Sequence, residues 1–294
     1  VLAETPFYPE QGGQVGDVGE IADLHNGWSF RVDSTHRYGS IIVHHGRCEC
    51  GTLTIDLPSA AKVGGGSTTR VTASVDLSTR SPTMSNHTST HLLNWALREV
   101  LGERVEQKGS LVDPEKTRFD FSHGKPVTLE ELTRIESLVT EQIGAEMPVY
   151  TKEVEQRRAR EINTLRAVFG EKYPDTVRVV SIGADIDEML GDPSNDKWMK
   201  YSVEFCGGTH LKKSSEAECF ALITEEGVAK GVRRVVGITG SAARDARQRG
   251  ADLLAELDSI TGQQEDDLAA RVTALQTKIN ESVIPVVVRH QLRE

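Results

Sequence analysis

The sequence has little cysteine, no excess of positive charge and no long apolar run. Four cysteines in 294 residues exclude a disulfide-built scaffold and favour a reducing compartment, in which thiols are free to bind metal. Lys and Arg total 34 against 44 Asp and Glu, and the resulting net charge of −10 argues against indiscriminate nucleic-acid binding. A local basic patch would still allow an RNA partner. No apolar run approaches the roughly 20 residues that span a bilayer, and no signal-peptide pattern is present.

The chain reads as a piece of a longer protein without internal repeats. Its first residue is not Met, and VLAETPFYPE resembles the middle of a strand. We therefore expect an excised segment.

Residues 1–78 are predicted to form a small β-barrel. Short β-rich runs are separated by turns rich in Gly and Asp, and a flexible loop is expected at 63–67. The expected strands are 28–32, 40–44, 52–57 and 69–75. Cys48 and Cys50 have no second cysteine pair nearby, so we interpret them as solvent-edge strand residues.

Residues 79–240 alternate helices and strands and predict an α+β core. Helices are expected at 86–101, 129–145 and 153–165, the last rich in arginine. Helices on one side of a mixed or antiparallel sheet give this class. The expected strands are 109–112, 117–121, 177–182, 202–206, 219–224 and 232–239.

Residues 241–294 are predicted to form a long C-terminal helix that acts as a connector. Apolar residues recur at intervals of three, four and seven residues, with a break at Gly262. Such a helix packs on a partner or leads to another domain. The repeating residues are Leu254, Leu257, Leu268, Val272, Leu275 and Ile279.

His87 and His91 stand four residues apart near the start of the first predicted helix, for which Ser85 or Asn86 is the expected N-cap and Gly102 the end. Four residues are about one helical turn, so both imidazoles lie on one face and can bind one ion. Two donors do not complete a zinc site.

Cys206 and His210 supply the missing donors. They flank Gly207 and Gly208, which permit a tight turn, after a run in which Tyr201, Val203 and Phe205 alternate as in a strand. Each pair alone is a common chance pattern, but together they form a tetrahedral nitrogen and sulfur set that favours zinc.

The histidine helix lacks the general base of zinc peptidases. The residue after His87 is Thr88, and no carboxylate lies between the histidines, so the H-E-x-x-H motif is absent. Activation of water would come from the metal, the substrate or a residue elsewhere.

Several blocks, taken in order, resemble the editing domain of alanyl-tRNA synthetases. They are FYPEQGGQVGD, SNHTSTHLLNWALREVLG, QKGSLV, RFDF, TLRAVFGEKYPDTVRVVSIG and SVEFCGGTHL. The resemblance covers residues 1–239. The sequences of these blocks are closer to those of eukaryotic cytosolic members than to those of free-standing archaeal editors. It implies a cytoplasmic protein, with a mitochondrial location as the alternative.

The resemblance implies hydrolysis of the ester in Ser-tRNA(Ala) and Gly-tRNA(Ala). An alanine pocket gains only about 1–3 kcal/mol from one methyl group, so it neither rejects glycine nor fully excludes serine, and a second, hydrolytic site is needed. The partners implied are the acceptor end of tRNA(Ala) and, in the full-length protein, the aminoacylation domain and the C-terminal domain. Nothing here resembles the aminoacylation domain, so we expect that the segment does not charge tRNA.

Family positions carried onto this chain give the site residues. His87, His91, Cys206 and His210 are the zinc ligands, in a site that is either closed or open to water. Thr90, Gln107 and Ser110 line the pocket, where hydroxyl and amide groups can hydrogen-bond a seryl hydroxyl. Ordinary roles for these three remain open: a helix-surface threonine and a strand entry.

RNA contact is expected from basic residues near the metal motif. Lys212, Lys213, Arg233 and Arg234 are the candidates for tRNA phosphates. Two further sets have an ordinary alternative. An arginine cluster can be a solvated face, and the GGQ triplet resembles a release-factor loop but is favoured as a turn. These residues are Arg157, Arg158, Arg160 and Arg166, and Gly12, Gly13 and Gln14.

Two alternatives to a synthetase editing domain remain. One is a free-standing deacylase with the same chemistry. The other is a zinc-stabilised RNA-binding module without activity. Release of serine from Ser-tRNA(Ala) separates the enzymes from the binding module.

Overall fold

The structure is a computed structural model that describes residues 2–23, 27–51, 70–168, 171–261 and 268–293. Its contacts divide the chain into two compact units, residues 1–81 and 82–294. Among the described residues no helix has the length and apolar character needed to cross a bilayer. The predicted division at residues 78 and 240 stays a prediction.

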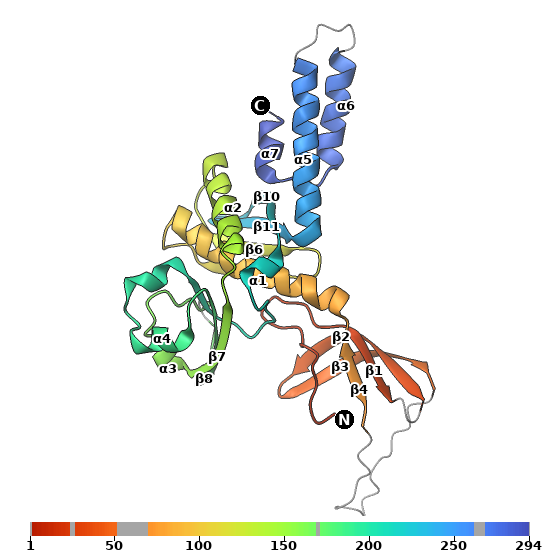
Figure 1. Ribbon diagram of the computed structural model, residues 1–294, viewed down its shortest axis with the longest axis vertical. Helices are drawn as coiled ribbons and strands as arrows, with labels where there is room; N and C mark the ends of the chain where they lie inside the picture. Colours follow the sequence, from red (N-terminus) through yellow and green to blue (C-terminus); the bar gives the residue numbers. More distant parts are fainter. Residues whose placement is uncertain (1, 24–26, 52–69, 169–170, 262–267, 294) are drawn as a thin grey trace, which may run out of the picture. The chain divides into compact units, whose positions relative to one another are not determined.

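The N-terminal unit is built on an open four-stranded antiparallel sheet (Figure 1). Its strands are β1 (Gly19–Asp23), β2 (Trp28–Tyr38), β3 (Ile41–Cys50) and β4 (Thr72–Val75), in the order β3-β2-β1-β4. The predicted barrel is wrong for the described residues, because β3 and β4 are edge strands that do not pair with each other. The strand expected at 52–57 and the loop at 63–67 lie outside the described residues.

Two predictions for this unit are confirmed. The GGQ triplet is a tight turn: Gly12 and Gly13 have φ values of 60° and 87°, and the backbones of Gln11 and Gln14 exchange hydrogen bonds of 3.2 and 3.1 Å. Both φ values favour glycine, and the Gln14 side chain is buried. Cys48 and Cys50 are exposed free thiols on the edge strand β3.

Helix α1 (Leu77–Leu101) carries the two histidines and begins well before the predicted N-cap. Ser85 and Asn86 lie inside the helix, so that prediction is wrong. The side chain of Asp76 accepts a hydrogen bond from Ser78 N at 2.8 Å, which satisfies a free backbone donor at the true start. Gly102 follows the last helical residue with a φ of 98°, as predicted for a glycine C-cap.

The main core lies between two helices and one face of a second antiparallel sheet. The sheet has the order β10-β11-β6-β5, and α1 and α2 (Leu129–Gly144) pack on the face that bears Phe119, Phe220 and Leu222. Its strands are β5 (Gln107–Val112), β6 (Thr117–Ser122), β10 (Phe220–Ala229) and β11 (Val232–Thr239). This confirms the α+β prediction.

A three-stranded antiparallel sheet, β7 (Val149–Glu155), β8 (Thr176–Ile182) and β9 (Ser202–Phe205), has its own core. It corrects the helix predicted at 153–165, because residues up to Glu155 pair with β8 and only α3 (Gln156–Ala159) is helical. Strand pairing overrides local helix propensity there. The remaining short elements are α4 (Ile186–Gly191), η1 (Asp196–Lys200) and η2 (Ser214–Ala217).

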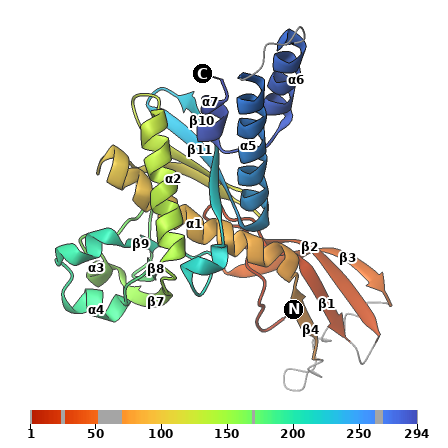
Figure 2. The ribbon, with the colours of Figure 1, turned by 45° about the horizontal axis from the view of Figure 1, so that its top comes forward.

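The described C-terminal residues are largely helical as predicted, but they form three helices and not one long helix. Helices α5 (Gly240–Thr261), α6 (Leu268–Glu281) and α7 (Val286–Gln291) lie side by side (Figures 1 and 2). Their shared core contains Leu253, Leu254, Leu257, Ile260, Leu275, Ile279, Ile284, Val288 and Leu292. The first turns of α5 pack on the sheet through Ala243 and Ala246, which contact Ala221 and Ile238. Leu268 and Val272 are exposed, and the break at Gly262 lies outside the described residues.

Candidate metal centre

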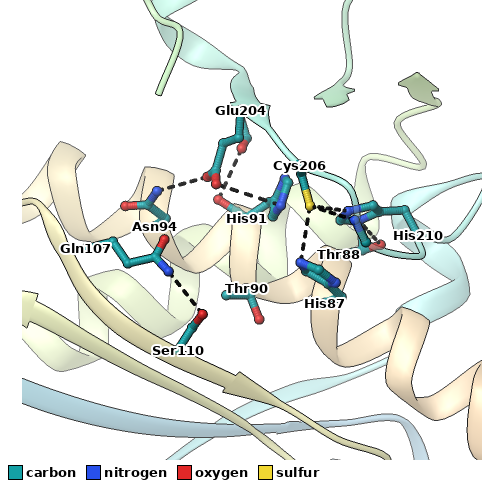
Figure 3. A network of polar contacts seen from close by, with 12 residues as sticks. His87, Thr88, Thr90, His91, Asn94, Gln107, Ser110, Glu204, Cys206 and His210 are labelled. Carbon is teal, nitrogen blue, oxygen red and sulfur yellow. Dashed lines mark hydrogen bonds and ion pairs between the residues drawn. The ribbon is translucent and has the colours of Figure 1, made fainter. Parts of the chain in front are cut away.

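Strand β9 places every second residue against α1. Val203 and Phe205 point into the core of the three-stranded sheet, as the predicted alternation requires. Ser202 and Glu204 point the other way: Ser202 Oγ donates to His91 O at 3.2 Å, and Glu204 accepts from Asn94 Nδ2 at 2.9 Å. Cys206 continues this second series directly after the strand and reaches the same side of α1 (Figure 3).

The four predicted ligands come together. The ligand atoms of His87, His91, Cys206 and His210 all lie within 4.8 Å of one another. Cys206 Sγ lies 3.4 Å from His87 Nε2 and 3.3 Å from His210 Nε2. Figure 3 shows the three rings and the sulfur facing a common point between α1 and the turn after β9. Two segments that are far apart in sequence thus form one cluster that can hold a metal ion.

Burial keeps the nitrogen ligands uncharged. It lowers the pKa of His91 to about 3 and the pKa of His87 and His210 well below the usual value, and the nearby Arg178 charge adds to each effect. Burial also raises the pKa of the Cys206 thiol to about 12. The imidazoles are therefore ready to bind a cation at neutral pH, whereas the sulfur must first lose a proton.

The turn that carries Cys206 is held by hydrogen bonds. Arg178 Nη1 donates to Cys206 O at 3.0 Å and to Gly208 O at 2.6 Å, and Gly208 N donates to Cys206 Sγ at 3.3 Å. Gly207 and Gly208 are both described, and neither has a positive φ. The turn therefore depends on these contacts and not on left-handed glycine conformations.

Sequence reasoning missed the residues around the ligands. Glu204 Oε2 lies 3.7 Å from His91 Nε2, and burial raises the pKa of Glu204 to about 7. Thr88 Oγ1 lies 3.2 Å from His210 Nδ1. Sequence position offered a signal for both residues. Glu204 lies two residues before Cys206, so a strand places both side chains on the same face. Thr88 lies between the two histidines of the first predicted helix.

The three predicted pocket residues are described, and Thr90 points away from the cluster (Figure 3). The Thr90 hydroxyl donates to Asn86 O at 2.7 Å and lies 2.5 Å from Thr117 Oγ1. Gln107 Nε2 donates to Ser110 Oγ at 3.0 Å on β5. In the described structure Thr90 thus faces the sheet that carries Gln107 and Ser110.

The four predicted RNA-binding residues differ in whether the described structure already pairs their charged groups with a carboxylate. Lys212 and Lys213 are exposed and directly follow the ligand turn. Arg233 donates two hydrogen bonds, of 2.5 and 2.6 Å, to Glu225. Arg234 donates two more, of 2.7 and 2.8 Å, to Asp120. The lysines are therefore better available to a phosphate.

The predicted arginine cluster is not a helical face. Arg166 donates to Glu103 at 2.5 Å, and the Arg160 guanidinium lies 5.5 Å from the centroid of the Phe205 ring. Arg157 and Arg158 are exposed and lie within the short helix α3.

Two family models match parts of the chain. Residues 177–236 match the "Threonyl and Alanyl tRNA synthetase second additional domain", a range that includes Cys206 and His210. Residues 1–63 match "tRNA synthetases class II (A)". The second match places residues 1–63 within a class II synthetase model, and the expectation that the segment does not charge tRNA stays a prediction.

The chain is 41% identical to the mitochondrial alanine–tRNA ligase of Saccharomyces cerevisiae and 40% identical to the cytoplasmic alanine–tRNA ligase of Dictyostelium discoideum. Both alignments cover 100% of this chain, and 29% and 30% of the relatives. The alanine–tRNA ligase of Halorhodospira halophila is 42% identical over 96% of this chain and 29% of its own length.

The whole chain is therefore similar to one segment of the alanine–tRNA ligases. It spans less than a third of the length of these relatives. The alanine–tRNA ligases it matches carry both mitochondrial and cytoplasmic names at nearly equal identity, so they favour neither compartment.

Proposed function

We propose that this segment of an alanine–tRNA ligase hydrolyses the aminoacyl ester of mischarged tRNA(Ala), with serine and glycine as the amino acids removed. The observation that carries the proposal is the meeting of four metal donors from α1 and the turn after β9. Hydrolysis adds water across the ester and releases the free amino acid and the ribose hydroxyl of the tRNA. An alanine-selecting enzyme needs such a second site because one methyl or one hydroxyl gives limited discrimination.

The donor set fits a zinc ion. Across a tetrahedral zinc with ordinary bond lengths, sulfur and nitrogen ligands lie about 3.6 Å apart, and the two distances here are 3.4 and 3.3 Å. His91 Nδ1 is buried and has no hydrogen-bond partner among the described residues. A cation held at that nitrogen would supply the missing partner. Three imidazoles and a thiolate form a set that favours zinc over harder ions.

His87, His91, Cys206 and His210 would hold the zinc ion, which when bound supplies a Lewis acid for the ester carbonyl, for water or for the substrate amine. The family's synthetic chemistry lies outside what we propose for this segment.

Thr90, Gln107 and Ser110 are proposed to bind the amino acid. The Thr90 hydroxyl hydrogen is already donated to Asn86 O, so its oxygen can only accept from a substrate O–H or N–H. Gln107 donates to Ser110 and keeps its own carbonyl oxygen available as an acceptor. These acceptors suit a seryl hydroxyl, which alanine lacks.

Lys212 and Lys213 are proposed to contact phosphates near the acceptor end of tRNA(Ala). Arg233 and Arg234 would do so only by sharing guanidinium groups that already bind carboxylates. The relatives are longer ligases, which favours action within such a ligase, beside its aminoacylation and C-terminal domains, over a free-standing deacylase. We propose the cytoplasm as the compartment.

Release of serine from Ser-tRNA(Ala) by the full 294-residue chain tests the proposal. We expect hydrolysis by the wild type and its loss in Cys206→Ala. Cys219→Ala is the matched control, because Cys219 is a partly buried free thiol outside the cluster. Serine release no faster than in Cys206→Ala would leave the alternative of a zinc-stabilised tRNA-binding module.

A further inference from the structure

We propose that Thr88 is a positioning residue of the metal centre. Its hydroxyl oxygen holds His210 in the tautomer that leaves Nε2 free for the ion. The inference rests on the proposed metal centre. It goes beyond the ligand set because Thr88 is not itself a ligand.

The orientation of His210 assigns the proton. Nε2 lies 3.3 Å from Cys206 Sγ and so faces the other ligands. A neutral imidazole with its lone pair at Nε2 carries its proton on Nδ1. Nδ1 lies 3.2 Å from Thr88 Oγ1. When His210 binds the ion, the Thr88 oxygen therefore accepts the Nδ1–H hydrogen bond, which fixes both the tautomer and the ring plane.

The acceptor is itself held in place. Leu211 N donates to Thr88 Oγ1 at 3.1 Å, so donors from two consecutive residues converge on one oxygen. Thr88 is 0% exposed, which leaves no access for water to replace the hydroxyl. Helix α1 therefore positions three of the ligands. It carries His87 and His91 itself, and it orients the ring of His210 through the Thr88 oxygen.

The two threonines of HTSTH have opposite roles, and their contacts distinguish them. The Thr90 hydroxyl contacts Asn86 O and Thr117 Oγ1 and no member of the metal cluster. The Thr88 hydroxyl contacts a ligand and the residue after it. Figure 3 shows Thr88 beside His210, whereas the Thr90 side chain points away from the cluster. Of these two threonines, therefore, only Thr88 is placed to change metal affinity.

The test is the zinc dissociation constant of the full chain, measured by competition with a chelator. Removing a residue that orients a metal ligand weakens binding about 10- to 100-fold, and we expect that loss in Thr88→Val. Thr88→Ser keeps the hydroxyl and should bind like the wild type. Thr164→Val is the matched control, because Thr164 is equally buried and its hydroxyl contacts Tyr201 O and no ligand.

Thermal unfolding with and without zinc separates positioning from a purely structural role. Thr88→Val leaves two buried donors without an acceptor, so the metal-free protein also loses stability. A positioning role reduces the rise in Tm that zinc produces. Equal Tm losses in both forms, with wild-type zinc affinity, would overturn the proposal. If the valine variant does not fold, Thr88→Ala carries the same prediction.

The failures of the two proposals are distinguishable. A wild-type chain that binds no zinc refutes the metal centre and with it the role of Thr88. A wild type that binds zinc, together with a Thr88→Val variant of equal affinity, refutes only the role of Thr88. Serine release is measured separately and tests the hydrolase proposal alone.

Discussion

Single side chains in the metal cluster differ in how burial affects their protonation. Burial lowers the pKa of all three histidines and raises the pKa of the Cys206 thiol, because in each case it disfavours the charged form. For the histidines this favours metal binding, and for the cysteine it opposes binding. Cys206 is therefore the ligand through which pH should control the site.

Metal affinity should fall about tenfold for each pH unit between about pH 9 and about pH 7.5, a range that lies above the pKa of about 7 of the neighbouring Glu204 carboxyl. The pKa of Cys206 is raised to about 12, so the free thiol carries a proton that binding releases, and lower pH favours the metal-free form. The histidines are already neutral and release none. Zinc affinity measured over this range, in a background with Cys48→Ala and Cys50→Ala to remove the exposed thiols, checks the slope. A flat profile, or a slope of several protons, would contradict this assignment.

Gln107→Ala should reduce hydrolysis of the seryl ester more than that of the glycyl ester. The variant removes an acceptor proposed for the seryl hydroxyl, and one such hydrogen bond is worth about 1 kcal/mol, or about fivefold in the ratio of the two kcat/KM values. Lys108→Ala is the control, because Lys108 is the exposed neighbour on the same strand. Equal losses for both esters would mean that Gln107 does not sense the hydroxyl.

The ligand set could be predicted from residue types and spacing, but the surrounding contacts could not. Metal donors are rare and chemically distinctive, so two pairs with four-residue spacing identify one another. Thr88 and Glu204 are common residues whose importance comes from which atom they face, and that depends on how β9 meets α1. The same limit applies to Arg233 and Arg234, whose carboxylate partners lie on other strand positions.

At the scale of whole elements, local sequence signals predicted the helix that has a capping box at its N-terminus. They failed for a segment whose structure is set by pairing with a distant strand. Helix α2 has a capping box formed by Thr128 and Glu131, and it matches the predicted helix within one residue. The predicted helix at 153–165 contains charged residues that favour helix, yet residues 149–155 form strand β7 against β8. The start of α1 was missed because Asp76, not Ser85 or Asn86, provides the capping oxygen.

Thr128→Ala should lower the stability of the C-terminal unit by about 1 kcal/mol, because it removes the oxygen that accepts Glu131 N at 3.2 Å. Denaturant unfolding followed by the fluorescence of buried Trp95 and Trp198, in a Trp28→Phe background that silences the N-terminal unit, measures the change. The control is Thr133→Ala, which alters an exposed hydroxyl within the same helix. No difference between the two variants would rule out a stabilising cap.

At the scale of the whole molecule, the net negative charge opposes the proposed binding of tRNA. A chain of charge −10 repels a polyanion, so the proposed binding to tRNA(Ala) would depend on a few well-placed cations. Many of the arginines described near the proposed site already bind carboxylates or carbonyls, as Arg166, Arg178, Arg233 and Arg234 do. Lys212 and Lys213 are exposed beside the ligand turn, and this makes them the natural test of local recognition.

The double variant Lys212→Ala/Lys213→Ala should bind tRNA(Ala) more weakly, with a shallower dependence on salt. Each lost phosphate contact reduces the slope of log affinity against log salt by about one. The matched control is Lys125→Ala/Lys278→Ala, which changes net charge equally but removes lysines paired with Glu131 and Glu256. If only overall charge matters, both variants weaken binding alike and keep similar slopes. Binding titrations from low to moderate salt therefore decide whether the acidic molecule meets RNA through this turn.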